Sequence, residues 1–220
     1  MSKSYSFPMF LIALLLCLEV SHAQDWRAFR GPIGDGSSKF ENLPTEWGVD
    51  KNVTWKKELP GEGWSSPVVA GATVVITAAV PQEKELVDTK YDLVVMALDL
   101  QTGKLIWNTT VFVQPVDAPA RHQKNSHASP TPIVHQGRIY VHFGHQGTAC
   151  LTLDGKIVWK TVAVDYRPVH GNGGTPIIVD ETLVFSVDGA ATTKVLALST
   201  ASGDVAWVFD RRTDAPRKFS

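Results

Sequence analysis

The sequence predicts an all-β fold built from a four-stranded antiparallel unit that repeats about every 50 residues. The clearest of the observations behind this prediction is a series of tryptophans with spacings of 52, 52 and 48 residues, at Trp55, Trp107, Trp159 and Trp207. A turn that contains glycine precedes the last three of them, and a Ser/Thr-Pro pair opens each repeat. Such long-period self-similarity indicates several copies of one structural unit in contact with one another.

The Ser/Thr-Pro pairs keep step with the tryptophans. They lie in SSPVVAG at 65–71, SPTPIVHQG at 129–137 and GGTPIIVDE at 173–181, and each leads into a β-branched run. Four short strands in a repeat of roughly 40–50 residues are typical of a propeller blade. The sequence therefore predicts a β-propeller of four-stranded antiparallel blades, with about three complete blades and an N-terminal outer closing strand.

The first repeat defines the four strands most clearly. β-branched and aliphatic residues predict strands at Val68–Ala70, Thr73–Ala79, Asp92–Leu98 and Lys104–Val111. Proline at position 67 is tolerated because it lies at the start of a strand. The pattern of short strands separated by turns is what an antiparallel meander requires.

The turn between the third and fourth strands carries a distinctive chemistry. Asp99 begins the turn, and Gly103 is expected to adopt the left-handed conformation of a bulged hairpin loop, which glycine reaches without steric cost. Gly203 occupies the same place in a loop of equal length. The middle repeat is shorter, and Asp154-Gly155 predicts a two-residue primed turn.

The repeated tryptophans have a structural interpretation. Trp107, Trp159 and Trp207 fall on the outermost strand of each repeat, where a large ring can cover the seam between neighbouring sheets. Trp55 precedes the first repeat and predicts a further outer strand of the same type. Residues 25–50 supply no three strands to accompany it, so we expect the chain to be an N-terminal part of a larger propeller. The rival is a short protein that closes by self-association.

The first 23 residues predict a signal peptide. Lys3 gives a positive start, an apolar run covers Phe7–Leu18, and Ser21-His22-Ala23 supplies a small-x-small cleavage site. The run is shorter than the roughly 18–20 apolar residues that span a bilayer, which argues against a membrane anchor. Cys17 leaves lipidation open, although large leucines precede it. The mature chain is expected to be exported to the periplasm or cell envelope, without a transmembrane segment.

The domain boundaries follow from the repeat. We predict an N-terminal segment with the closing strand at 24–60, then blades at 61–113, 114–163 and 164–210. Residues 211–220 would begin the loop to a following blade. Only Cys150 remains after cleavage, so the mature chain can form no internal disulfide and has no zinc-type cysteine pair. The net charge of −1 argues against a nucleic-acid partner, because such a partner requires a basic face.

The loops that enter each first strand are expected to gather on one face near the propeller axis. They are 61–66, 120–129 and 166–174, joined by 144–147. These loops carry the candidate ligand-binding residues, which are Arg121, His122, Lys124, Asn125, His127, His145, His170 and Asn172. One interpretation is a metal or anion site, because neutral imidazole is a common metal ligand. The other is a hydrated polar rim that caps backbone groups. The histidines lack tight chelating spacing, so no metal site is assigned.

The pattern A-x-D-x-x-T-G-K-x-x-W, which runs from Ala97 to Trp107, resembles the tryptophan-docking motif of PQQ-type, or quinoprotein-like, β-propellers. The start DWRAFRGPIGDGSS is similar to exported PQQ-like repeat proteins of planctomycetes and related bacteria. The resemblance covers nearly all of the mature chain. It assigns a structural docking role to Ala97, Asp99, Gly103, Trp107, Gly155, Trp159, Gly203, Trp207 and Trp55.

The resemblance implies two classes of function. The family includes pyrroloquinoline-quinone alcohol dehydrogenases and the non-catalytic BamB-type subunit of the outer-membrane barrel assembly machine. Such dehydrogenases hold the quinone and a calcium ion in the axial channel, commonly beside a disulfide made by adjacent cysteines. Cys150 stands alone, and the sequence has no C-x-x-C-H haem motif. We therefore favour a scaffold with an envelope protein partner and no cofactor; the alternative is a PQQ-dependent dehydrogenase-like oxidoreductase.

Overall fold

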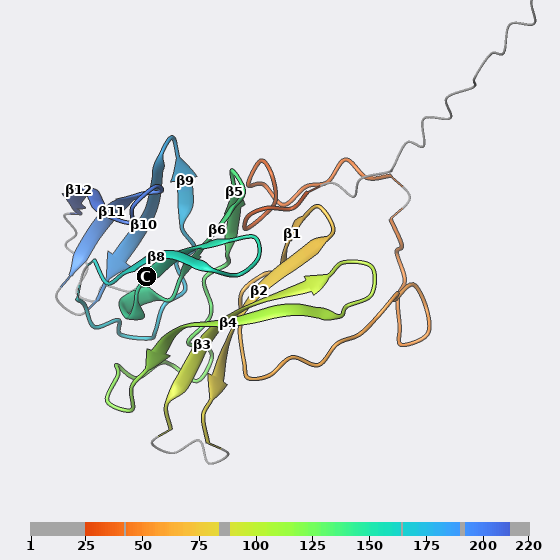
Figure 1. Cartoon of the computed structure of the whole chain (residues 1–220), viewed down its shortest axis with the longest axis horizontal. Coiled ribbons are helices and arrows are strands. Elements are labelled where there is room, and N and C mark those ends of the chain that lie inside the picture. The colour runs from red at the N-terminus through yellow and green to blue at the C-terminus, as the bar shows by residue number, and fades with distance from the viewer. Residues whose placement is uncertain (1–24, 42, 84–88, 164, 190–191, 212–220) are drawn as a thin grey trace, which may run out of the picture.

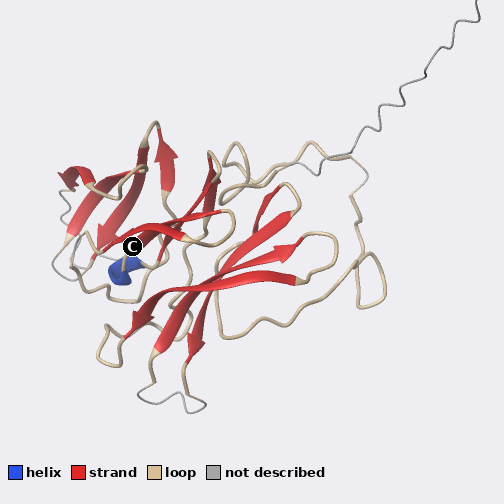
Figure 2. Ribbon diagram, in the orientation of Figure 1, coloured by secondary structure: helices blue, strands red, loops and turns tan. Residues whose placement is uncertain are grey.

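The computed structural model describes residues 25–41, 43–83, 89–163, 165–189 and 192–211. These residues form three four-stranded antiparallel sheets, which we call blades 1, 2 and 3 (Figures 1 and 2). Blade 1 consists of β1 (Val68–Ala70), β2 (Thr73–Pro81), β3 (Tyr91–Asp99) and β4 (Leu105–Gln114). Blade 2 consists of β5 (Ile133–His135), β6 (Arg138–His142), β7 (Thr148–Thr152) and β8 (Ile157–Thr161). Blade 3 consists of β9 (Ile177–Val179), β10 (Thr182–Asp188), β11 (Thr193–Ser199) and β12 (Val205–Asp210).

Within each blade the strands pair in chain order, so each blade is a simple meander. A single-turn 3-10 helix, η1 (Gly144–Gln146), joins β6 to β7. The predicted strands of the first repeat all form, although β2, β3 and β4 extend beyond the predicted ends by one to three residues. The prediction of four-stranded antiparallel propeller blades is confirmed. No helix in the described part of the chain is long and apolar enough to cross a membrane.

Apolar side chains fill the two seams between neighbouring blades. The first seam packs Val75, Leu93 and Val95 of blade 1 against Ile139 and other residues of blade 2. Full burial of a side chain of this size contributes roughly 1.5–3 kcal/mol, so a dozen of them outweigh the few hydrogen bonds that cross the seam. The second seam is filled by residues of blades 2 and 3, among them Tyr140 and Phe185.

Each seam is closed at its outer rim by a tryptophan that bonds to the next blade. The indole Nε1 of Trp107 donates to the carbonyl of Leu153 at 3.0 Å, and that of Trp159 donates to the carbonyl of Thr200 at 3.0 Å. Trp55 repeats the contact on blade 1, where its Nε1 donates to the carbonyl of Leu100 at 2.8 Å. In all three cases the acceptor lies in the turn between the third and fourth strands. Each of these three indoles thus bonds to a turn of the blade beside it.

Glycine is required in each of these turns for two reasons. Gly103, Gly155 and Gly203 have φ values of +66°, +82° and +78°, as predicted for the left-handed position. A Cβ atom on Gly155 would also lie 2.7 Å from the ring of Trp107, and one on Gly203 would lie 2.5 Å from the ring of Trp159. The glycine therefore makes the turn and also leaves room for the indole ring.

One sequence prediction about these turns is wrong. Asp154 and Gly155 do not form a primed turn, because only Gly155 has a positive φ and a type I′ turn needs two such residues. Instead the amide of Gly155 donates to the carbonyl of Thr152 at 3.0 Å, and a bulge follows in the β7–β8 pairing. The shorter loop thus keeps the same glycine-bulge geometry as the other two.

Trp55 docks as expected but is not part of a strand. Residues 53–59 have no regular structure, and the pair that docks on the outer face of blade 1 is Trp55 with Leu59. A docked ring needs only a carbonyl and a glycine, whereas a strand needs a neighbouring backbone to pair with. The described residues before β1 contain no such neighbour, so the predicted closing strand is absent from them.

Trp207 occupies the equivalent position on blade 3, opposite Ala197, but has no turn to bond to in the described part of the chain. Its side chain is 44% exposed, and its neighbour Phe209 is 61% exposed. The residue placement on the outer strand is as predicted, while the docking contact is made only where a following blade is present.

The Ser/Thr-Pro pairs close the inner end of each seam. The amide of Ser66 in blade 1 donates to the hydroxyl of Thr131 at 3.1 Å, and the amide of Thr131 donates to the hydroxyl of Thr175 at 3.1 Å. The residue before each proline therefore links one blade to the next. This explains why a hydroxyl-bearing residue recurs at that place in the sequence.

The N-terminal segment runs across the inner strands of two blades (Figure 1). Trp26 forms a bridge to Val69 of β1, and the carbonyl of Arg27 accepts the amide of Val134 in β5. The predicted signal peptide lies outside the described residues, as do residues 212–220. The blade boundaries between them stay predictions.

Candidate functional site

The three entry loops are joined by direct hydrogen bonds near the inner ends of the blades. Asn125, in the entry loop of blade 2, donates from its Nδ2 to the carbonyl of His170 at 3.0 Å and to that of Asn172 at 3.4 Å. The backbone amide of His122 also donates to the carbonyl of His170, at 3.1 Å. The loops of blades 2 and 3, which lie about 45 residues apart in sequence, are therefore held side by side.

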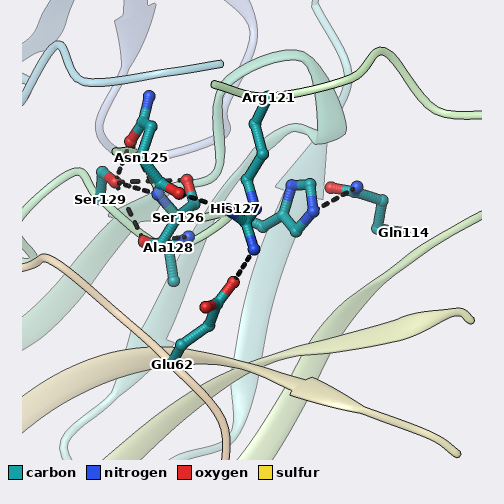
Figure 3. A network of polar contacts seen from close by, with 8 residues as sticks. All are labelled: Glu62, Gln114, Arg121, Asn125, Ser126, His127, Ala128 and Ser129. Carbon is teal, nitrogen blue, oxygen red and sulfur yellow. Dashed lines mark hydrogen bonds and ion pairs between the residues drawn. The ribbon is translucent and has the colours of Figure 1, made fainter. Parts of the chain in front are cut away.

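Arg121 connects the same face to blade 1 (Figure 3). Its guanidinium forms an ion pair with Glu62 and donates to the carbonyl of Asn125 at 2.6 Å. The side chain of Arg121 is 21% exposed and that of Glu62 is 42% exposed, so solvent screening keeps the net contribution of the pair modest. The Nε of Arg121 is buried and has no hydrogen-bond partner among the described residues.

Two serines hold Asn125 in place (Figure 3). The hydroxyl of Ser129 donates to its Oδ1, which also accepts the amide of Ser126 at 2.9 Å. The hydroxyl of Ser126 lies 3.0 Å from that of Ser129 and accepts the amide of Ala128 at 3.2 Å. Asn125 is thus fixed on both sides, so its amide acts as a rigid bracket between two loops.

His122 and Lys124 lie at the exposed end of this bracket. The Nδ1 of His122 accepts the amide of Lys124 at 3.1 Å, and its ring meets that of His170 edge to face with centroids 5.3 Å apart. Both imidazoles stay exposed to solvent. Lys124 is also exposed and is therefore available to a partner.

His145 in η1 belongs to a second, more buried group. Its Nδ1 lies 3.2 Å from the Nδ2 of Asn172, whose Oδ1 accepts the hydroxyl of Tyr166 at 2.5 Å. Burial is the main cause that lowers the pKa of His145; the negative charge of Asp165 opposes it and the positive charge of Arg167 adds to it. Its role in this arrangement is to hold the blade 3 loop against blade 2.

His127 points away from the other candidates and toward blade 1. Its Nε2 lies 3.1 Å from the Nε2 of Gln114, and its ring packs 4.9 Å from that of Tyr91. Burial lowers the pKa of His127 to about 4, and the charges of Arg121 and His145 act in the same direction. The ring is therefore a neutral hydrogen-bonding group that joins the blade 2 loop to the end of β4.

The sequence missed the aromatic residues of this face. A cavity of about 420 Å³ opens beside the bracket, and all three blades contribute to it. Its walls are Phe29, Trp64, Lys124, Asn125, Ser129, Thr131, Gly173 and Thr175. Trp64 is 61% exposed and Phe29 is 49% exposed. The sequence signal was the tryptophan directly before the first Ser-Ser-Pro, which breaks the 52-residue spacing and so does not belong to the docking series.

The loop residues include no cluster suited to a metal ion. Within the described ranges, no three side chains of His, Cys, Asp or Glu come together. The imidazoles and amides of the candidate residues are used largely to join the loops to one another. The seven candidates other than His127 are connected through Asn125 and Asn172, and ligand binding by all eight stays a prediction.

A comparison with protein-family models identifies the chain. The family described as outer membrane protein assembly factor BamB matches residues 45–162 and 91–219, which together span more than three quarters of the sequence. The chain belongs to this PQQ-like β-propeller family. Among curated proteins, no sequence matches.

Two solved quinohemoprotein structures share the fold of this chain, and a BamB structure was also matched. Quinohemoprotein alcohol dehydrogenase from Comamonas testosteroni aligns over 85% of this chain and 27% of its own, with 16% identity and a TM-score of 0.62. The quinohemoprotein alcohol dehydrogenase ADHIIG from Pseudomonas putida HK5 aligns over 71% of this chain and 22% of its own, with 20% identity and a TM-score of 0.51. BamB from Moraxella catarrhalis aligns over 71% of this chain and 51% of its own, with 14% identity and a TM-score of 0.40.

The TM-scores of the two dehydrogenase structures support a common fold and nothing further. The BamB-family chain spans about a quarter of the length of the two dehydrogenases. The family model is described as an assembly factor, whereas the two dehydrogenases that share the fold are oxidoreductases by title. The choice between the two classes has to come from this chain's own residues.

Proposed function

We propose that this BamB-family chain is a non-catalytic binding or assembly scaffold of the cell envelope, and that the loop face holds a protein partner. The observation that carries the proposal is the pair of exposed aromatic rings, Trp64 and Phe29, beside Lys124 around a cavity shared by three blades. Tryptophan is enriched among the residues that dominate protein–protein binding energy, because its large ring desolvates well on contact.

The polar groups around the cavity also favour binding over catalysis. The amide of Asn125 and the imidazole of His145 are committed to other loop residues. His127 and His145 both have a lowered pKa, which makes them weak bases near neutral pH. A rigid face with an aromatic anchor is what a scaffold needs, and it requires no proton transfer.

The test is a comparison of two tryptophans. Full-length protein with Trp64→Ala, isolated from its own envelope under mild extraction, is expected to lose a co-purifying partner by at least tenfold, since burial of an interface tryptophan contributes about 2 kcal/mol or more. Trp47→Ala is the matched control, because Trp47 is 72% exposed in the N-terminal loop and lies outside the cavity. Equal recovery of the partner by the two variants would contradict the proposal.

The second candidate is a quinoprotein dehydrogenase. The observation in its favour is the exposed ammonium of Lys124 at the cavity wall, which suits a carboxylated quinone. Cys150 does not supply the disulfide of adjacent cysteines that such dehydrogenases commonly place beside the quinone, since it is buried in the second seam and has no neighbouring cysteine. Titration of the full-length protein with pyrroloquinoline quinone and calcium distinguishes the two, and a scaffold predicts no change in quinone absorbance.

A further inference from the structure

The N-terminal segment shows how an extended chain binds the inner edge of a blade. Trp26 exchanges two backbone hydrogen bonds with Val69 of β1, at 2.8 and 2.9 Å. One residue later, the carbonyl of Arg27 accepts the amide of Val134 in β5 at 2.8 Å. These contacts use main-chain groups, so they depend on the free edge of the inner strand rather than on its side chains.

The inner strand of blade 3 has the same kind of edge, but the N-terminal segment forms no hydrogen bond with it in the described structure. The inner strands β1, β5 and β9 are each three residues long, and their central residues are Val69, Val134 and Ile178. These pair with Val74, Ile139 and Leu183, in the same register of the same hairpin. Since hydrogen-bonded and non-bonded pairs alternate along antiparallel strands, the central residue directs its N–H and C=O away from its own blade.

Ile178 is therefore the blade 3 equivalent of two residues that already bind an extended chain. Its amide and carbonyl make no hydrogen bond to any residue that the structure describes. Isoleucine 178 is only partly buried, so these groups are open to solvent from the cleft beside them. An unpaired strand edge of this kind is a template for the addition of another strand.

A cleft of about 700 Å³ separates β9 from the N-terminal segment. Its walls include Phe29 and Ile33 of the segment, Ile133 of β5 and Ile178 of β9. Ile33 is 72% exposed. The charges at its rim, Asp25 and Arg27, form an ion pair with each other, so the cleft favours uncharged side chains. The volume lies in the range that is typical of ligand-binding pockets.

We propose that the inner edge of β9 binds an extended, apolar segment of a protein partner by strand addition. The backbone of that segment bonds to the N–H and C=O of Ile178, and one of its apolar side chains enters the cleft against Phe29 and Ile33. This inference rests on the proposed binding function; its cleft shares Phe29 with the loop face but does not include Trp64. The partner is a peptide rather than a small molecule because the unpaired groups are main-chain groups in strand geometry.

The probe is a synthetic peptide with the sequence DWRAFRG, acetylated and amidated, which corresponds to residues 25–31. This sequence already pairs with two of the three inner edges in the intact chain. Added to the full-length, isotope-labelled protein, it is expected to shift the amide resonance of Ile178 and to slow hydrogen exchange at that amide by at least tenfold at saturation.

Two variants make the test specific. Ile178→Pro removes the amide donor at a position whose N–H takes no part in its own sheet, and it is expected to weaken peptide binding at least tenfold. Ile33→Lys places a positive charge in the cleft, which repels a peptide of net charge about +1, and it should weaken binding to a similar degree. Val179→Thr is the control, because Val179 is an exposed neighbour on β9 that is absent from the cleft wall.

The outcomes separate this inference from the proposed function. Shifts confined to Val69 and Val134 would mean that the peptide only exchanges with the chain's own segment, and would overturn the inference. Undiminished binding to Ile178→Pro, or no binding at millimolar peptide, would overturn it as well. Peptide binding that persists in Trp64→Ala, together with loss of the envelope partner, supports both proposals. Peptide binding without any envelope partner supports the β9 site and contradicts the scaffold role of the loop face.

Discussion

The two seams between blades are closed by the same contacts but are filled differently. Each has a tryptophan on the outer rim that bonds to a glycine turn, and a threonine hydroxyl on the inner rim that bonds to an amide. Between these rims the first seam is apolar, with Val75 as a central residue. The second seam places Tyr140 at the equivalent register position.

The contrast extends to the next positions along the same faces. Thr77 lies in the first seam where the second seam has His142, and Ala97 lies under its tryptophan where the second seam has Cys150. His142 stacks on Phe185 of blade 3 with centroids 4.2 Å apart. The comparison teaches that the rim contacts define how blades join, whereas the interior residues set how each seam responds to conditions.

The largest expected effect comes from removal of the rim tryptophans. Trp107→Ala and Trp159→Ala are each expected to destabilise the protein by about 3 kcal/mol, since each loses a large apolar contact and a hydrogen bond to the next blade. Trp207→Ala serves as the control and should cost less than about 1 kcal/mol, because that ring is half exposed. Urea unfolding measures all three. A cost for Trp207→Ala equal to the others would show that docking is not what these rings contribute.

A somewhat smaller effect is expected at the glycines beneath the rings. Gly155→Ala and Gly203→Ala place a methyl group within 2.7 and 2.5 Å of an indole ring, and should destabilise by about 2–3 kcal/mol. Gly137→Ala is the matched control, because Gly137 has a similar φ of +72° and nothing within 4 Å. It should cost only about 1 kcal/mol from backbone strain. Equal costs at Gly137 and Gly155 would assign the whole effect to the turn.

A fall in pH should destabilise the protein through two buried histidines. His142 lies in the second seam, and His127 lies in the loop that covers the first seam. Burial lowers the pKa of His142 to about 3 and that of His127 to about 4. Both rings are neutral when folded, while the unfolded chain takes up protons below about pH 6.5, so stability is full above that pH and falls as the pH drops. The slope is about 1.4 kcal/mol per pH unit for each histidine.

Thermal unfolding followed from pH 7 down to about pH 3 checks this prediction. His142→Gln and His127→Gln should each remove one histidine's share of the slope. The loss from His127 levels off near pH 4, whereas that from His142 continues to about pH 3. An unchanged slope in His142→Gln would contradict the assignment of a neutral histidine to the seam.

The smallest expected effect concerns the hydroxyl of Thr77. Its Oγ1 is buried without a hydrogen-bond partner in the described structure, so Thr77→Val should stabilise the protein by about 1 kcal/mol. Thr148→Val should instead destabilise the protein, because the hydroxyl of Thr148 bonds to the Nδ1 of His142 at 2.8 Å. Calorimetry of the two variants gives the comparison. Destabilisation by Thr77→Val would indicate a partner for its hydroxyl.

Much of the candidate site followed from the sequence, since the repeat places the entry loops on one face. The particular contacts did not, because they join residues from different loops. That Asn125 would bond to the carbonyls of His170 and Asn172 depends on how two blades pack. His127 shows the limit most clearly. It shares a loop with Asn125, yet one turn of backbone directs its ring toward Gln114 instead.

The sequence by itself determined the features that are local or that repeat. Strand periodicity, the glycine turns and the tryptophan spacing defined four-stranded blades, because β-branched alternation and left-handed glycine are properties of a few adjacent residues. Only the tertiary structure decided which tryptophan has an acceptor. Trp159 and Trp207 follow similar glycine turns, but the contact needs the turn of another blade. The unpaired edge at Ile178 has the same origin, since a strand edge is free or filled according to what packs beside it.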